Sequence, residues 1–192
     1  MSGSGKVYGV GVGPGDRELL TLKAVQHLQQ ADVVAFVVNH RGESMTKTIA
    51  SAYFNPAAVE LPIYVPMAED RTDAQQAYRQ AVQKILNHVQ QARQVTILCL
   101  GDPFFYASFI YLFALLKNHC PIEIIPGITA MQTASALSLT PLASGNASMA
   151  ILAAPLVESR LMDTLRNFEH VLILKANRSR ELIINALHRR SH

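Results

Sequence analysis

The sequence predicts an open, doubly wound α/β domain that is followed by a second, smaller α/β domain. Segments typical of strands and of helices alternate along all 192 residues. The strand segments are short, almost continuous apolar runs, which suits parallel strands that are buried on both faces. Glycine-containing turns directly follow several of these runs, where ligands bind to α/β sheets. We place the two domains at residues 1–140 and 141–192.

The first half of the N-terminal domain is expected to contain three strands and three helices. Residues 6–12, 32–38 and 59–64 are the predicted strands. Apolar residues recur at helical spacing between residues 19 and 28, and Asp16 is a candidate N-cap for that helix. A short helix is predicted over residues 44–53. The longest helix, residues 70–93, has an apolar stripe that runs from Tyr78 to Val89.

The second half of this domain adds two strands and two helices. Residues 95–100 and 122–125 are predicted strands, with a helix over about 104–117 between them. Another helix follows Gly127 and ends near Leu139. Five strands with helical crossovers favour a doubly wound sheet.

The C-terminal domain has fewer elements. Strands at residues 149–153 and 170–175 alternate with helices at 158–167 and 179–189. A sheet of two strands is marginally stable unless it packs on something else. We therefore expect this part to pack against the first domain or against a partner, or to be a truncated domain.

Composition indicates a globular protein with a substantial core. Hydrophobic residues make up 49% of the chain and charged residues 16%. No stretch approaches the roughly 20 apolar residues of a transmembrane helix, and the N-terminus lacks the apolar core of a signal peptide. These observations predict a cytoplasmic protein that does not bind membranes.

The reactive residue types show no metal-ligand or disulfide pattern. Cys99 and Cys120 lack paired spacing, and the seven histidines are dispersed. We expect no protein-bound metal. The net charge is +3, but the basic residues are scattered and no nucleic-acid-reading module is present, which predicts no nucleic-acid partner.

Three motifs stand where a predicted strand meets a helix, and they are expected to share one edge of the sheet. They are GVGPGD at residues 11–16, GDPFFY at 101–106 and PGITA at 126–130. The first does not fit a dinucleotide fingerprint, because Asp16 stands where the last glycine belongs, and it lacks the Gly-Lys-Ser/Thr of a P-loop. Pro14 removes a backbone donor and Asp16 adds negative charge, so a nucleoside triphosphate is disfavoured.

Several residues of these motifs have two interpretations. Asp102 is either the N-cap of the helix near Phe104 or an acceptor or base that faces the cleft. Thr129 either caps its helix or hydrogen-bonds a ligand. Phe105 or Tyr106 could line the pocket of a flat hydrophobic ligand, although most aromatic residues here belong to the core.

The three motifs together closely resemble the tetrapyrrole methylase family, and the resemblance covers nearly the whole chain. It implies two α/β domains with a ligand cleft between them, S-adenosylmethionine as methyl donor, a tetrapyrrole substrate and a homodimer. The motifs look most like the branch that methylates carbon 20 of precorrin-2 or cobalt-precorrin-2 in cobalamin synthesis. The alternatives are another methylase of the family, such as one acting on uroporphyrinogen-III, and a truncated, non-catalytic tetrapyrrole-binding member.

The resemblance also implies roles for individual residues. The positions implied to contact the cofactor are Pro14, Leu100, Gly101, Asp102, Phe105, Thr129 and Ala130. The strand that ends at residues 174–176 would supply a wall from the second domain. Methyl transfer to an electron-rich tetrapyrrole needs alignment and then a base. Asp102 is the candidate base, with Lys175 and Tyr106 as further candidates.

Overall fold

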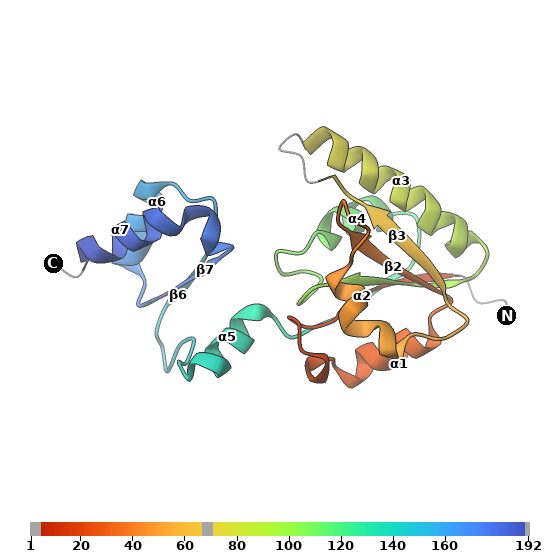
Figure 1. The fold of residues 1–192 in the computed structure, drawn as a ribbon, viewed down its shortest axis with the longest axis horizontal. Helices are drawn as coiled ribbons and strands as arrows, with labels where there is room; N and C mark the ends of the chain where they lie inside the picture. The colour runs from red at the N-terminus through yellow and green to blue at the C-terminus, as the bar shows by residue number, and fades with distance from the viewer. Residues whose placement is uncertain (1–4, 67–70, 191–192) are drawn as a thin grey trace. The chain divides into compact units, whose positions relative to one another are not determined.

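A computed structural model describes residues 5–66 and 71–190 of the chain. The backbone forms two compact units, Met1–Ala130 and Met131–His192 (Figure 1). The boundary expected at residue 140 lies after the helix α5 (Ala130–Ser138), whereas in the structure this helix, apart from Ala130, is grouped with the second unit.

The first unit is built on a parallel sheet of five strands. The strands are β1 (Lys6–Gly11), β2 (Val33–Val38), β3 (Val59–Tyr64), β4 (Gln94–Cys99) and β5 (Ile122–Ile125). Their order across the sheet is β3-β2-β4-β1-β5, and every pairing is parallel. The predicted open α/β sheet is therefore confirmed.

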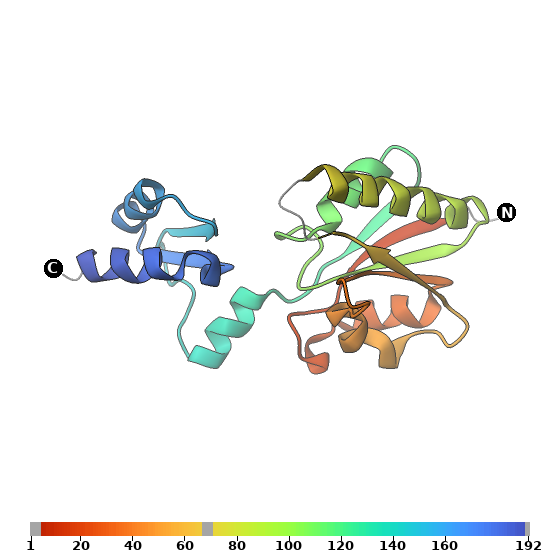
Figure 2. The same cartoon turned by 45° about the horizontal axis from the view of Figure 1, so that its top comes forward.

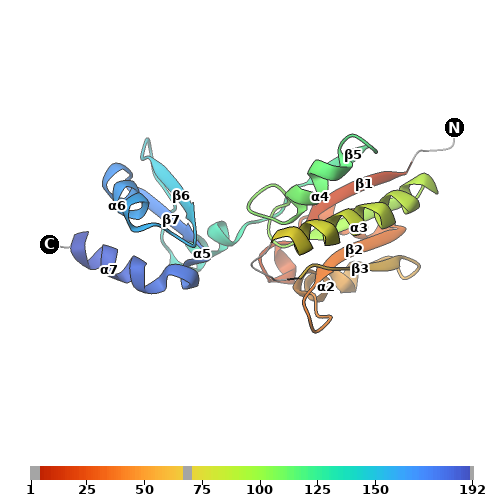
Figure 3. The same cartoon turned by 90° about the horizontal axis from the view of Figure 1, so that it is seen from above.

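Helices cover both faces of this sheet (Figure 2). α1 (Leu22–Gln30) and α2 (Met45–Ala50) pack on one face, and α3 (Arg71–Gln90) and α4 (Phe109–Leu116) on the other. The alternation of side chains along β2 explains both layers. Val34 belongs to the core on the α1 and α2 face, whereas Val33 belongs to the core beneath α3 and α4. Figure 3 shows α3 and α4 lying over this face of the sheet.

The first predicted helix starts later than expected. Asp16 caps a single 3₁₀ turn, Arg17–Leu19, by accepting the N–H of Glu18. Thr21 is the true N-cap of α1, because its hydroxyl accepts the N–H of Ala24. The prediction for Asp16 was therefore wrong about the helix that it caps.

The helix predicted from about residue 104 also starts later, at Phe109. Asp102 does not cap it, because its carboxylate accepts the N–H of Phe104 within a tight turn. Residues 100–108 thus form the loop that connects the end of β4 to the start of α4. Residue 70, the first of the long predicted helix, lies outside the described residues.

The strand order places a topological switch between β2 and β4. The chain leaves β2 through α2 and leaves β4 through α4, which lie on opposite faces of the sheet. It then continues to opposite sides, from β2 to β3 and from β4 to β5. The loops after β2 and β4 therefore diverge at the carboxyl ends of these strands, which is where ligands bind in open α/β sheets.

The second unit contains a parallel sheet of two strands in its described part. β6 (Met149–Ala153) pairs with β7 (His170–Leu174), and the helices are α6 (Glu158–Asn167), α7 (Arg180–Arg190) and the short η3 (Ala176–Ser179). Its small core is Leu152, Leu161, Leu165 and Ala186. This agrees with the two strands predicted from the sequence.

Candidate functional site

The three motifs meet at the carboxyl ends of β1, β4 and β5 in the first unit. Gly101 donates its N–H to the carbonyl of Gly13 at 2.8 Å, so the loops after β4 and β1 form a short antiparallel bridge. The N–H of Gly127, after β5, reaches Oδ2 of Asp102 at 3.1 Å. We call these three connected loops, residues 11–16, 100–106 and 126–130, the loop junction.

Glycine is required at the loop junction because the backbones approach so closely. A Cβ on Gly11 would lie 2.5 Å from the carbonyl oxygen of Gly101 and 2.6 Å from the Cα of Gly127. A Cβ on Gly127 would lie 2.8 Å from the Cα of Gly11. These distances are far below van der Waals contact, which explains why two different motifs carry glycine at these places.

Asp102 joins two of the loops through both oxygens of its carboxylate. Oδ1 accepts the N–H of Phe104 at 2.8 Å, and Oδ2 accepts the N–H of Gly127. Backbone N–H groups that point at a carboxylate form strong, charge-assisted hydrogen bonds. The structure therefore supports a structural role for Asp102, and its role as a base stays a prediction.

The other predicted cofactor residues lie in or beside the loop junction. Thr129 is buried, and its Cα is 3.8 Å from the position of a Cβ on Gly101. Pro14 directly follows the bridged Gly13, and Phe105 is half-buried in the loop after Asp102. Leu100 and Ala130 are exposed.

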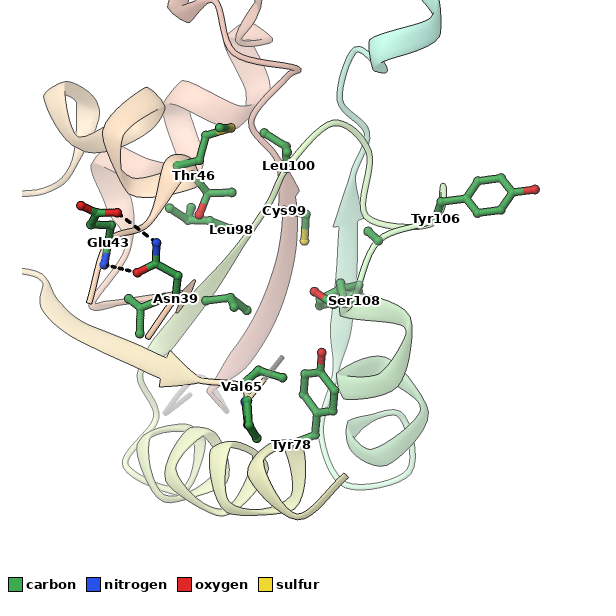
Figure 4. Close-up of a pocket in the computed structure, with 16 residues that line it drawn as sticks. Asn39, Glu43, Thr46, Val65, Tyr78, Leu98, Cys99, Leu100, Tyr106 and Ser108 are labelled. Carbon is green, nitrogen blue, oxygen red and sulfur yellow. Dashed lines mark hydrogen bonds between the residues drawn. The ribbon is translucent and has the colours of Figure 1, made fainter. Parts of the chain in front are cut away.

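The two further candidates for the base are exposed and have an unusual backbone. Tyr106 has φ of 53° and Lys175 has φ of 56°, in the left-handed region that side chains rarely adopt. The ring of Tyr106 points away from the other residues of Figure 4. Lys175 lies in the second unit, directly before η3. Such strained residues are frequent at functional sites, but their catalytic roles stay predictions.

A pocket of about 540 Å³ lies beside the loop junction, over the carboxyl ends of β2 and β4 (Figure 4). Its apolar lining includes Val37, Val65, Leu98, Cys99, Leu100 and Phe109. Leu100 both lines this pocket and directly precedes Gly101. The pocket therefore lies at the switch point between β2 and β4 and adjoins the loop junction.

Polar side chains stand on two sides of the pocket. On one side, Asn39 donates through Nδ2 to Oε2 of Glu43 at 3.0 Å, and its own Oδ1 accepts the N–H of Glu43. On the other side stand the hydroxyl groups of Tyr78 and Ser108. Burial raises the pKa of the Cys99 thiol, so this cysteine stays neutral in the wall.

Sequence reasoning missed these polar residues. Tyr78 was assigned to the apolar stripe of the longest helix, which is correct for its ring, whereas its hydroxyl faces the pocket. A signal was available for Asn39, because a polar residue directly after a buried strand lies at the ligand-binding edge of the sheet.

Among the described residues, no group of three or more His, Cys, Asp or Glu side chains could hold a metal ion. No described helix is long and apolar enough to cross a membrane.

Comparison with known proteins extends over almost the whole chain. Residues 6–192 match the model of the tetrapyrrole (corrin/porphyrin) methylases. The chain is 35% identical over 193 residues to a precorrin-2 C(20)-methyltransferase of Sinorhizobium sp., covering 96% of this chain and 79% of that one. It is 32% identical over 178 residues to a probable cobalt-precorrin-2 C(20)-methyltransferase of Methanocaldococcus jannaschii, covering 92% and 74%.

A solved structure shows the same fold. The cobalt precorrin-4 methyltransferase, a cobalamin biosynthetic enzyme, superposes with a TM-score of 0.70 at 25% identity. The match covers 94% of this chain and 74% of that one.

Proposed function

Because the chain belongs to the tetrapyrrole (corrin/porphyrin) methylases, we propose that it methylates carbon 20 of precorrin-2, or of cobalt-precorrin-2, in cobalamin biosynthesis. The methyl donor is S-adenosylmethionine, the donor that this family uses. The observation that carries the proposal is the large pocket directly beside the loop junction, with Leu100 common to both. One side would hold the tetrapyrrole and the other the methyl donor, so that the two reactants meet at the end of β4.

The residues of the loop junction fit S-adenosylmethionine in their chemistry. None of the three motifs contains Lys or Arg, which a polyphosphate would need, whereas a sulfonium carries its own positive charge. Pro14 and Leu100 offer apolar surface to the donor. The backbone of Gly101 and of residues 129–130 would bind its polar groups. S-adenosylmethionine supplies an activated methyl group when it is bound.

The protein's own contribution would be alignment and water exclusion. Holding a nucleophilic carbon in line with the methyl and its sulfur can supply much of the rate enhancement without a reactive side chain. The apolar walls of the pocket, among them Val65 and Phe109, would exclude water from the face of the tetrapyrrole. Asp102, Tyr106 and Lys175 remain the candidates for the base that removes the final proton.

The donor site is tested by calorimetric titration of the full chain with S-adenosylhomocysteine. We expect micromolar affinity, about −8 kcal/mol. Leu100→Arg should abolish this binding, because the long cation would occupy the boundary between junction and pocket. Leu22→Arg is the matched control, since Leu22 is 83% exposed on α1 and should tolerate the change. Equal affinity in Leu100→Arg and the wild type would place the donor elsewhere.

The acceptor carbon is tested by turnover with a ¹³C-labelled methyl donor. The wild-type chain is incubated anaerobically with precorrin-2 and, separately, with its cobalt complex. Mass spectrometry should show one added methyl group, and ¹³C NMR should place it at carbon 20. A methyl group on another carbon would assign the chain to a different step among the tetrapyrrole methylases.

A further inference from the structure

The pocket beside the loop junction holds a pair of hydroxyl groups that neither the motifs nor the comparisons assign. Tyr78 comes from the middle of α3, and Ser108 directly precedes α4. Both residues line the pocket. Figure 4 shows both hydroxyls directed toward the space between the walls, on the side away from Asn39 and Glu43.

The ring of Tyr78 is held firmly in place. Only 8% of the residue is exposed, and the ring stacks on that of Tyr111 with 5.5 Å between the centroids. Burial raises the pKa of the Tyr78 hydroxyl, so it keeps its proton at neutral pH. The wall therefore presents a neutral, pre-positioned hydroxyl group.

Ser108 uses its hydroxyl in an unusual way for a residue at a helix start. The N-cap residues Thr21 and Ser44 each accept a backbone N–H from their own helix. Ser108 makes no such capping hydrogen bond, and its hydroxyl is directed toward the pocket. α4 therefore lacks the stabilisation of about 1 kcal/mol that an N-cap hydrogen bond typically contributes. The side chain thus serves the pocket wall rather than its own helix.

Counting protons shows what this pair can offer to a ligand. Each hydroxyl carries one proton, which it can donate to an acceptor on the ligand. The polar groups on the other side differ, because the carboxylate of Glu43 brings negative charge there. An anionic group of a ligand would be repelled from Glu43 and would favour the hydroxyl side.

We propose that the Tyr78–Ser108 pair positions the tetrapyrrole by donating a hydrogen bond to one of its peripheral carboxylates. The inference rests on the proposed function, in which this pocket holds the tetrapyrrole. Reduced tetrapyrroles of this class carry acetate and propionate groups around the ring and N–H donors at its centre. The carboxylate on the hydroxyl side fixes the rotation of the ring in the pocket. That rotation decides which bridging carbon faces the methyl donor, so Tyr78 and Ser108 are positioning residues.

The test compares Tyr78→Phe and Ser108→Ala with Tyr111→Phe in the full chain. Tyr111→Phe is the matched control, because it removes the same atom from the stacked partner ring, which does not line this pocket. The probe is the stable oxidised form of precorrin-2, whose binding is followed by fluorescence, together with its methyl ester. Affinity for S-adenosylhomocysteine and the melting temperature are measured for each variant.

Tyr78→Phe and Ser108→Ala should each weaken binding of the acid probe about tenfold or more, the effect of one hydrogen bond to a charged group. Binding of the ester should be nearly the same in all proteins. Tyr111→Phe should stay within about twofold of the wild type, and affinity for S-adenosylhomocysteine should not change. With precorrin-2 as substrate, the two variants should also yield product methylated at more than one carbon.

Two results would overturn the proposal, and they are distinguishable. If the wild type binds the acid probe and both variants bind it equally well, the hydroxyl pair does not hold the ligand, while the proposed function stands. If the wild type binds S-adenosylhomocysteine but no tetrapyrrole, the proposed function is wrong. The proposed role of Tyr78 and Ser108 is then wrong as well, because it depends on a bound tetrapyrrole. Ser108 is exposed, so Ser108→Ala keeps the test decisive even if Tyr78→Phe does not fold.

Discussion

Asp102 illustrates at the residue scale how one side chain can join two motifs. Its carboxylate accepts N–H groups from Phe104 and Gly127, which belong to loops after different strands. A residue that both stabilises the loop junction and lies at the candidate site cannot be assigned to catalysis by loss of activity alone. Its stability effect has to be measured beside its kinetic effect.

Asp102→Asn should therefore destabilise the protein by about 1 to 2 kcal/mol, because an amide has one acceptor oxygen for two N–H donors. Denaturant unfolding measures this change. Asp16→Asn is the control, since Asp16 accepts a single N–H at an exposed 3₁₀ turn and asparagine caps equally well. Equal stability of Asp102→Asn and the wild type would remove the structural role, and any loss of turnover would then point to the proposed base.

At the scale of elements, the positions of the loops depend on how closely the strand ends approach. Gly127 has no room for a side chain, because Gly11 and Gly101 surround it. Gly127→Ala must push the loops after β1, β4 and β5 apart. We expect a loss of about 1 to 3 kcal/mol, typical of overpacking, and weaker binding of S-adenosylhomocysteine.

Gly42→Ala separates this clash from ordinary backbone strain. Gly42 has φ of 78° but nothing within 4 Å of an added Cβ, so only the left-handed conformation of alanine costs energy, about 1 kcal/mol. Thermal unfolding and donor binding are measured for both variants. If Gly127→Ala bound S-adenosylhomocysteine as tightly as Gly42→Ala does, the close approach of the loops would not matter for the donor site.

The outer strand β5 is joined to its neighbours by a charged cluster. Glu123 accepts hydrogen bonds from Lys23 of α1 at 2.6 Å and from Lys6 of β1 at 2.7 Å. These lysines lower the pKa of the Glu123 carboxyl to about 2. The unfolded chain has the ordinary pKa of about 4.3. The folded state therefore gains stability above about pH 4.3, and the gain is lost as the pH falls toward about 2.

Glu123→Gln should lower the free energy of unfolding at pH 6, and the difference from the wild type should shrink between about pH 4.3 and 2. Solvent screening keeps the effect modest, and added salt should reduce it. Glu60→Gln breaks one exposed pair with Lys47 and serves as the control, with a smaller expected effect. A difference between wild type and Glu123→Gln that is constant with pH would exclude the ionic origin of this stabilisation.

At the scale of the whole molecule, the second unit has little core for its size. In its described part, a two-stranded sheet and a core cluster of four buried apolar residues are marginal for independent stability, and Leu137 and Leu139 are 82% and 90% exposed. We therefore predict a homodimer in which these apolar groups are covered.

Light scattering after gel filtration should give twice the chain mass of 21.1 kDa. Leu137→Glu combined with Leu139→Glu should shift the protein toward the monomer, because the charges would have to be buried in the interface. Leu22→Glu, on the exposed face of α1, should leave the dimer intact. A monomeric wild type at micromolar concentration would contradict the prediction.

The sequence by itself determined the parallel sheet, because uniformly apolar runs such as residues 33–38 can be buried only between two layers of helices. The bounds of β3, β5, β6 and α6 agree with their predictions to the residue. Helix starts were less predictable, as at Asp16 and Asp102, because a capping side chain serves a single turn as well as a helix.

Which residues surround the candidate site depends on the tertiary structure. The strand order creates the switch point between β2 and β4, and periodicity along the chain carries no information on that order. Tyr78 shows the same limit, since its spacing indicates a buried ring but not that its hydroxyl lies with that of Ser108 in the wall of a pocket. Burial is encoded locally by the apolar pattern, whereas the meeting of polar groups from distant segments depends on how the layers pack.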